Sequence, residues 1–189
     1  MKREQANLQH RPFLIPIWLT GIAAFAVFSI ALLAIWVWFT ANATTVIVIR
    51  HAEKEPVSAP DPPLSPAGQA RAELLARMYG EPRDVGRLDA IYISATLRSR
   101  STAAPLASRL GITPIVAPSD DSKQLARRAL RDNGGKRVMI VAHVNTVPDI
   151  VAALSGRDDI PKMDEKDFSV MYIVTVPRIG RANVLLLNY

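Results

Sequence analysis

Two arginines and two histidines lie at or just after the ends of apolar segments that have the pattern of buried strands. Arg50 and His51 follow the run TTVIVI, and His143 follows VMIVA. Arg98 comes shortly after a third such segment, DAIYIS. A guanidinium pairs with phosphate oxygens through two hydrogen bonds and stays charged, and an imidazole can attack phosphorus or carry a proton near neutral pH. Together these residue types are suited to binding and transferring a phosphoryl group.

Residues 44–189 have the pattern of an α/β domain. Apolar, β-branched runs predict strands at 45–49, 89–94, 112–116, 138–142, 168–176 and 182–189. Helices are predicted at 65–80, 98–110, 122–132 and 146–154, the first with Ser65 as N-cap and Pro66 at its first position. Strands that alternate with helices indicate a mostly parallel sheet with helices on both faces. The break PRIGR before the last strand predicts a hairpin and so an antiparallel edge.

The predicted sheet brings the reactive residues to one edge. Ligands of open α/β sheets bind beyond the carboxyl ends of the strands. The chain has three histidines, and the two in this domain, His51 and His143, each follow a predicted strand directly. Two predicted helices begin close to the same edge, where their main-chain amides would favour an anion. The sequence therefore predicts a phosphate site containing both histidines and both arginines.

Four segments resemble motifs of the histidine phosphatase superfamily, the phosphoglycerate-mutase-like proteins. Arg50-His51-Ala52 resembles the Arg-His-Gly motif, ISATLRSRSTAAPLA resembles the segment with Leu-Arg and Thr-Ala, and VMIVAHVNTVPDIVAAL resembles the segment with the second histidine. PPLSPAGQARAELLA is similar to the segment that leads into the first helix of the family. The resemblance covers 44–189. It implies that His51 is the nucleophile and forms a phosphohistidine, that Arg50, Arg98 and His143 bind the phosphoryl group, and that neither a metal nor a cofactor takes part.

The sequence also departs from the family pattern. Ala52 replaces the motif glycine, and Val144 follows His143 where a small residue is more usual. No spacing identifies the general acid, for which Glu53, Asp120 and Asp121 are the candidates. The chain lacks the long insertions that cover the site in mutases, so we expect an open site. An open site favours a phosphatase, because a mutase must keep its intermediate away from water.

Other function classes fit the sequence less well. The absence of cysteine excludes disulfides, thiolate nucleophiles and the cysteine pair of zinc deaminases, although HAE at 51–53 matches part of the deaminase motif. Neither a G-x-x-x-x-G-K-[ST] phosphate loop nor a G-x-S-x-G elbow is present. The net charge of +6 comes from scattered basic residues, so we predict no nucleic-acid surface. The alternative to an enzyme is a catalytically inactive, membrane-tethered module that binds a phosphate ligand.

The segment 13–39 is apolar almost throughout and contains no Asp, Glu, Lys or Arg. As a helix it would be ~40 Å long, enough to cross the ~30 Å hydrocarbon core with some tilt. Trp18 lies near one end, and Trp36 and Trp38 lie near the other, as in an interfacial aromatic belt. The sequence therefore predicts a tail at 1–12, a transmembrane anchor at 13–39 and a phosphatase-like domain at 44–189.

The flanks of this segment predict its direction. The tail carries Lys2, Arg3 and Arg11 against one glutamate, which favours a cytoplasmic N-terminus and a periplasmic or extracellular domain. The ANA at 41–43 has the small-x-small form of a signal-peptidase site, so cleavage after Ala43 would release a secreted domain. The apolar run is longer than a signal h-region, which favours an uncleaved anchor.

A domain outside the cytoplasm would act on a small phosphorylated substrate, for example an envelope sugar phosphate. Similar small envelope phosphatases that act on lipopolysaccharide sugar phosphates also carry Arg-His-Ala-Glu, as at 50–53 here.

Overall fold

The computed structural model describes residues 17–80, 87–118 and 120–189. The chain divides into two units, one ending at Trp38 and the other beginning at Phe39. Helix α1 (Ile17–Ala41) accounts for the described part of the first unit, and its window Trp18–Trp38 has a mean hydropathy of 2.3 and no buried residue. Helix α1 is long and apolar enough to cross a membrane, and it is the one such helix among the described residues. The predicted tail and residues 13–16 of the predicted anchor lie outside the described residues.

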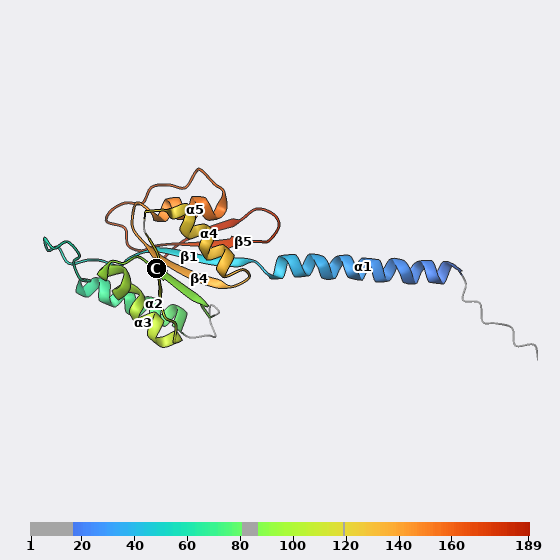
Figure 1. Ribbon diagram of the computed structural model, residues 1–189, viewed down its shortest axis with the longest axis horizontal. Coiled ribbons are helices and arrows are strands. Elements are labelled where there is room, and N and C mark those ends of the chain that lie inside the picture. The colour runs from blue at the N-terminus through green and yellow to red at the C-terminus, as the bar shows by residue number, and fades with distance from the viewer. Residues whose placement is uncertain (1–16, 81–86, 119) are drawn as a thin grey trace, which may run out of the picture. The chain divides into compact units, whose positions relative to one another are not determined.

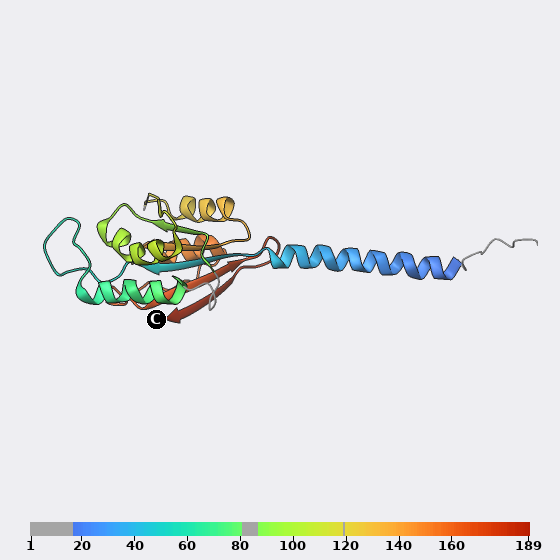
Figure 2. The same cartoon turned by 90° about the horizontal axis from the view of Figure 1, so that it is seen from below.

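The second unit is built on a six-stranded sheet with the order β3-β2-β4-β1-β5-β6. The strands are β1 (Thr44–Arg50), β2 (Ala90–Ile93), β3 (Ile115–Val116), β4 (Arg137–Ala142), β5 (Val170–Val176) and β6 (Asn183–Asn188). The first four are parallel, β5 is antiparallel to β1, and β6 is antiparallel to β5. Figure 2 shows β6 in dark red at the edge of the sheet, beside the C-terminus. The prediction of a mostly parallel sheet with an antiparallel edge is confirmed.

Helices cover both faces of the sheet, as predicted. Helices α2 (Pro66–Gly80) and α3 (Leu97–Leu110) lie on one side, and α4 (Ser122–Asp132) and α5 (Val147–Ser155) lie on the other (Figure 1). Strand β1 packs against both layers, because successive side chains of a strand point to opposite faces. Val46 and Val48 belong to the core with α4 and α5, and Ile47 and Ile49 belong to the core with α2 and α3. Each is at most 3% exposed, and burying such a side chain stabilises the fold by ~1.5–3 kcal/mol.

The third strand is shorter than the predicted 112–116. Gly111, with φ +66°, ends α3, and the main-chain N–H of Ile112 donates to the carbonyl of Ala107 at 3.0 Å. Ile112 is therefore part of the helix end, in the manner of a Schellman motif. Pro114 has no N–H to give to a neighbouring strand, so β3 pairs with β2 only at Ile115 and Val116.

Candidate active site

The order of the strands brings the two histidines together. Strand β4 lies between β1 and β2, with Arg50 opposite Ala142 and Ile93 opposite Val141. The residues that follow the three strands therefore leave the sheet at the same edge. The ring centroids of His51 and His143 are 5.3 Å apart.

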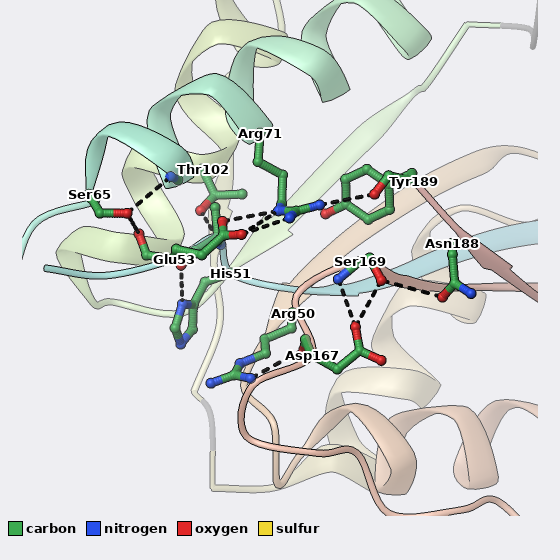
Figure 3. Close-up of polar contacts among 12 residues, drawn as sticks. Arg50, His51, Glu53, Ser65, Arg71, Thr102, Asp167, Ser169, Asn188 and Tyr189 are labelled. Atoms are coloured by element: carbon green, nitrogen blue, oxygen red, sulfur yellow. Dashed lines mark hydrogen bonds and ion pairs between the residues drawn. The ribbon is translucent and has the colours of Figure 1, made fainter. Parts of the chain in front are cut away.

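His51 is held in one orientation. Its Nδ1 lies 2.8 Å from the carbonyl oxygen of Ala52 (Figure 3). A carbonyl oxygen can only accept, so Nδ1 carries the hydrogen and Nε2 of the neutral ring has a free lone pair. The pKa of His51 is lowered to about 4, mainly by burial and further by the charges of Arg98 and Arg50, against an opposing effect of the bond to Ala52. The ring is therefore neutral at physiological pH, with Nε2 available for attack.

Arg50 is anchored by the chain segment between α5 and β5. Its Nη1 donates to the carbonyl oxygens of Glu165 at 2.6 Å and Asp167 at 3.2 Å (Figure 3 shows the second bond). Its guanidinium carbon also lies 3.9 Å from the centroid of the Phe168 ring, a cation–π contact. Burial lowers the pKa of Arg50, but a guanidinium stays charged in proteins. These contacts fix the plane of the guanidinium at the end of β1.

Arg98 is held by Asp61, a residue of the loop between β1 and α2. One carboxylate oxygen of Asp61 lies 3.6 Å from Nη1 of Arg98, and the other accepts from the main-chain N–H of Leu97 at 2.7 Å. Within the part of the chain that the structure describes, the buried Nε groups of Arg98 and Arg50 have no hydrogen-bond partner. Both arginines therefore retain donor capacity for an anion.

Both arginines and both histidines line one open cleft of about 550 Å³, so the structure brings together all four of these predicted site residues. The wall also includes Lys54, Thr96, Val144, Asn145, Thr146, Glu165 and Phe168. Burial lowers the pKa of His143, as do the charges of Arg98 and Arg50, while Asp61 opposes them. With both rings neutral, the described residues that line the cleft carry three cationic side chains and one carboxylate. This balance suits a phosphate ester, which carries negative charge.

His143 is joined to the end of β2 by hydroxyl groups. Its Nε2 lies 3.0 Å from Oγ of Ser94, and Ser94 in turn lies 2.8 Å from Oγ of Ser99 in the first turn of α3. Thr96 caps that helix by accepting from the N–H of Ser99. The second histidine is thereby positioned relative to the helix that carries Arg98.

Helices α2 and α3 both attach to the loop that follows His51. Thr102 of α3 accepts from the N–H of Ala52 at 2.9 Å and donates to the carbonyl of Arg98 at 2.7 Å. A side chain at Gly68 of α2 would clash with the carbonyl oxygen of Glu53. The threonine and the glycine in the motif segments therefore have physical roles in holding His51 near Arg98.

The predicted acid Glu53 is bound by Arg71. Nη2 and Nε of Arg71 lie 2.7 Å and 3.0 Å from the carboxylate, and Nη1 donates to the main-chain oxygen of Tyr189 at 3.0 Å (Figure 3). Burial raises the pKa of Glu53, but the hydrogen bonds and charge of Arg71 outweigh it, and the pKa lies below its ordinary value. A carboxyl group with a lowered pKa is a poor proton donor near neutral pH.

The other two predicted acids lie elsewhere. Asp121 caps α4 by accepting from the N–H of Gln124 at 2.8 Å, and it shares with Asp120 a separate surface hollow beside α5. The carboxylates near the phosphate site are instead Glu165, which lines the cleft, and Asp61, which pairs with Arg98. Neither was predicted, because each lies in an irregular segment whose sequence has no periodicity that would place it.

The sequence and the fold are similar to those of known proteins. Residues 46–119 match the histidine phosphatase superfamily (branch 1), a segment that includes Arg50, His51 and Arg98. No curated protein matches the sequence.

Solved structures share the fold. The protein histidine phosphatase SixA complexed with tungstate is 19% identical, with a TM-score of 0.62 over 76% of this chain and 96% of that one. A candidate phosphohistidine phosphatase SixA from Agrobacterium tumefaciens is 24% identical, with a TM-score of 0.58 over 77% and 97% of the two chains. A mycobacterial glucosyl-3-phosphoglycerate phosphatase is 16% identical, with a TM-score of 0.55 over 78% and 99%. The domain thus has the fold of the histidine phosphatase superfamily, and its segment 46–119 matches that superfamily in sequence.

Proposed function

We propose that this protein is a phosphatase that hydrolyses phosphate monoesters through a phosphohistidine at Nε2 of His51. The observation that carries the proposal is a neutral histidine with Nδ1 fixed by a carbonyl, in a cleft with two anchored arginines and a second histidine. The match of residues 46–119 to the histidine phosphatase superfamily supports the same reaction class.

The reaction proceeds in two displacements at phosphorus. In the first, the lone pair of Nε2 of His51 forms the N–P bond while the bond to the leaving oxygen breaks, and that oxygen takes up a proton. In the second, water attacks phosphorus, the N–P electron pair returns to Nε2, and inorganic phosphate leaves. Arg50, Arg98 and His143 stabilise the charge on the phosphoryl oxygens. Glu165 lines the cleft and Asp61 pairs with Arg98, so among the described residues these two carboxylates are our candidates for exchanging protons with the leaving oxygen and the water.

The purified full chain should hydrolyse p-nitrophenyl phosphate, and excess EDTA should leave the rate unchanged, because protein groups alone bind and attack the phosphoryl group. The lowered pKa of His51, about 4, keeps the attacking ring neutral below the ordinary histidine value of 6.5. After correction for substrate ionisation, kcat/KM should therefore stay high below pH 6.5 and fall only as the pH approaches 4. A half-maximal rate near pH 6.5 would indicate a solvated ring instead. Binding of tungstate without hydrolysis of any ester would favour the inactive binding module.

The proposal places the domain outside the cytoplasm, with α1 as an uncleaved anchor. It is supported by the charge-free segment 13–39 and the basic residues of the tail. Alkaline phosphatase fused after Tyr189 should be active in cells, and a fluorescent protein that matures only in the cytoplasm should be dark at the same position. The opposite pair of results would show that the domain lies in the cytoplasm. A mature N-terminus at Thr44 would show that the segment is a cleaved signal and not an anchor.

A further inference from the structure

The end of the sheet opposite the cleft carries exposed basic side chains. Lys136 and Arg137 lie where the chain enters β4, and Arg178 and Arg181 lie in the hairpin between β5 and β6. The segments 133–137 and 177–182 contain no Asp or Glu. Among the described residues, none of these four cationic side chains forms an ion pair. We call this surface, together with Ile179, the basic end.

Among the described residues, the acids beside the basic end form no ion pair with it. Asp89 accepts a hydrogen bond from the main-chain N–H of Arg137 and not from its guanidinium. Asp132, at the end of α4, pairs with Arg128 and Arg131 of the same helix. The described acids therefore leave the charges of the basic end available to an anionic partner.

Ile179 adds an apolar tip to this surface. It is 69% exposed and lies in the β5–β6 hairpin between Arg178 and Gly180, which has a φ of +111°. A large aliphatic side chain beside arginines could insert between lipid headgroups while the cations meet the lipid phosphates, as interfacial segments do.

The basic end borders the residue at which the sheet begins, shortly after α1 in the chain. Helix α1 ends at Ala41 and β1 begins at Thr44, and two intervening residues can span no more than ~11 Å. Thr44 pairs with Val176 at the base of the hairpin, and its Oγ1 accepts from the N–H of Gly135 at 2.9 Å. Both loops of the basic end therefore border the first residue of β1.

We propose that the basic end rests on anionic phospholipid headgroups, with Ile179 inserted among them, and so directs the cleft away from the lipid. Each Lys or Arg near an anionic bilayer surface adds to the attraction, which falls off within a Debye length.

The seven residues of β1 separate the basic end from His51 by ~20 Å at ~3.3 Å per residue. The cleft therefore takes phosphate esters dissolved in water and does not reach the phosphate of a bilayer lipid. This inference rests on the membrane placement and the phosphatase activity proposed above.

The absence of cysteine from the chain allows a direct test. The single-cysteine variants Ile179→Cys and Ser58→Cys of the full chain are labelled with the same environment-sensitive fluorophore. Ser58 is exposed in the loop between β1 and α2, at the cleft end of the domain. Each protein is reconstituted into phosphatidylcholine vesicles with or without phosphatidylglycerol, and quenching by a headgroup nitroxide lipid is measured. We expect several-fold stronger quenching at position 179 than at position 58, and only in the anionic vesicles.

Charge variants control for non-specific attraction. In the Ile179→Cys background, Arg178→Glu with Arg181→Glu should remove the additional quenching. The double variant Arg100→Glu with Arg127→Glu makes the same change in charge at exposed positions of α3 and α4. This variant should leave the additional quenching at position 179 unchanged. Equal quenching at positions 179 and 58 in anionic vesicles would overturn the docking proposal, as would equal effects of the two charge variants.

A substrate comparison in the same anionic vesicles tests the direction of the cleft. The protein should release phosphate from p-nitrophenyl phosphate and none from phosphatidic acid in the bilayer. Hydrolysis of phosphatidic acid would contradict the separation of the cleft from the lipid. Strong quenching at position 179 without hydrolysis of either ester would contradict the proposed activity and leave the docking surface supported.

Discussion

Replacing His51 by Ala should abolish the hydrolysis of phosphate esters, with a loss of ~10⁴-fold or more, because the variant lacks the nitrogen that forms the covalent intermediate. The fold should persist, since His51 follows β1 and the cores on both faces of the sheet are built from other residues. Turnover of p-nitrophenyl phosphate and the far-ultraviolet circular dichroism of the variant measure the two effects separately.

A second substitution controls for a loss of structure in the alanine variant. His51→Asn keeps an N–H that can donate to the carbonyl of Ala52, and it lacks the attacking nitrogen. We expect this variant to be as inactive as His51→Ala and to melt close to the unmodified protein. Activity near the unmodified level in either variant would show that His51 is not the nucleophile.

Replacing Arg98 by Ala should lower kcat by ~10²–10³-fold, because the guanidinium stabilises charge that develops on the phosphoryl oxygens. The change also leaves the carboxylate of Asp61 without its cationic partner, close to the bound anion. Arg98→Lys should restore little activity, since an ammonium group cannot form the paired hydrogen bonds of a guanidinium.

Arg100→Ala is the matched control for this prediction. Arg100 lies two residues further along α3 and is exposed, whereas Arg98 lines the cleft. Its removal should leave kcat within about twofold of the unmodified protein, as is usual for surface substitutions. Full activity in the Arg98→Lys variant would contradict a bidentate phosphate contact at this position.

The positions of His51 and His143 could be predicted because they depend on strands. Val46–Ile49 and Val138–Ala142 are apolar on both faces of the sheet, so their ends and the residues beyond them follow from the sequence pattern. The groups that hold the arginines depend on irregular chain. Arg50 is fixed by main-chain oxygens 115 and 117 residues away, and backbone carbonyls have no residue signature.

The general acid likewise could not be identified from the sequence. Glu53 was one of three candidates that no spacing could separate, and in the structure Arg71 of α2, 18 residues along the chain, binds its carboxylate. Asp61 reaches Arg98 because the pairing of Lys54 with Leu64 closes its loop, a contact that no local periodicity encodes. Side chains placed by loop closure could be assigned only from the structure.

Trapping the phosphoryl group tests the central claim most directly. A brief reaction of the full chain with ³²P-labelled substrate, quenched in alkali, should leave label that is stable in alkali, lost in acid and located by peptide mapping on His51. His143→Ala should slow turnover and still show label on His51, because His143 stabilises the phosphoryl group and does not attack it. Label on His143 would show that His143 attacks phosphorus and His51 stabilises the phosphoryl group. Full, chelator-sensitive activity without any covalent phosphate would contradict the mechanism and favour metal-assisted hydrolysis.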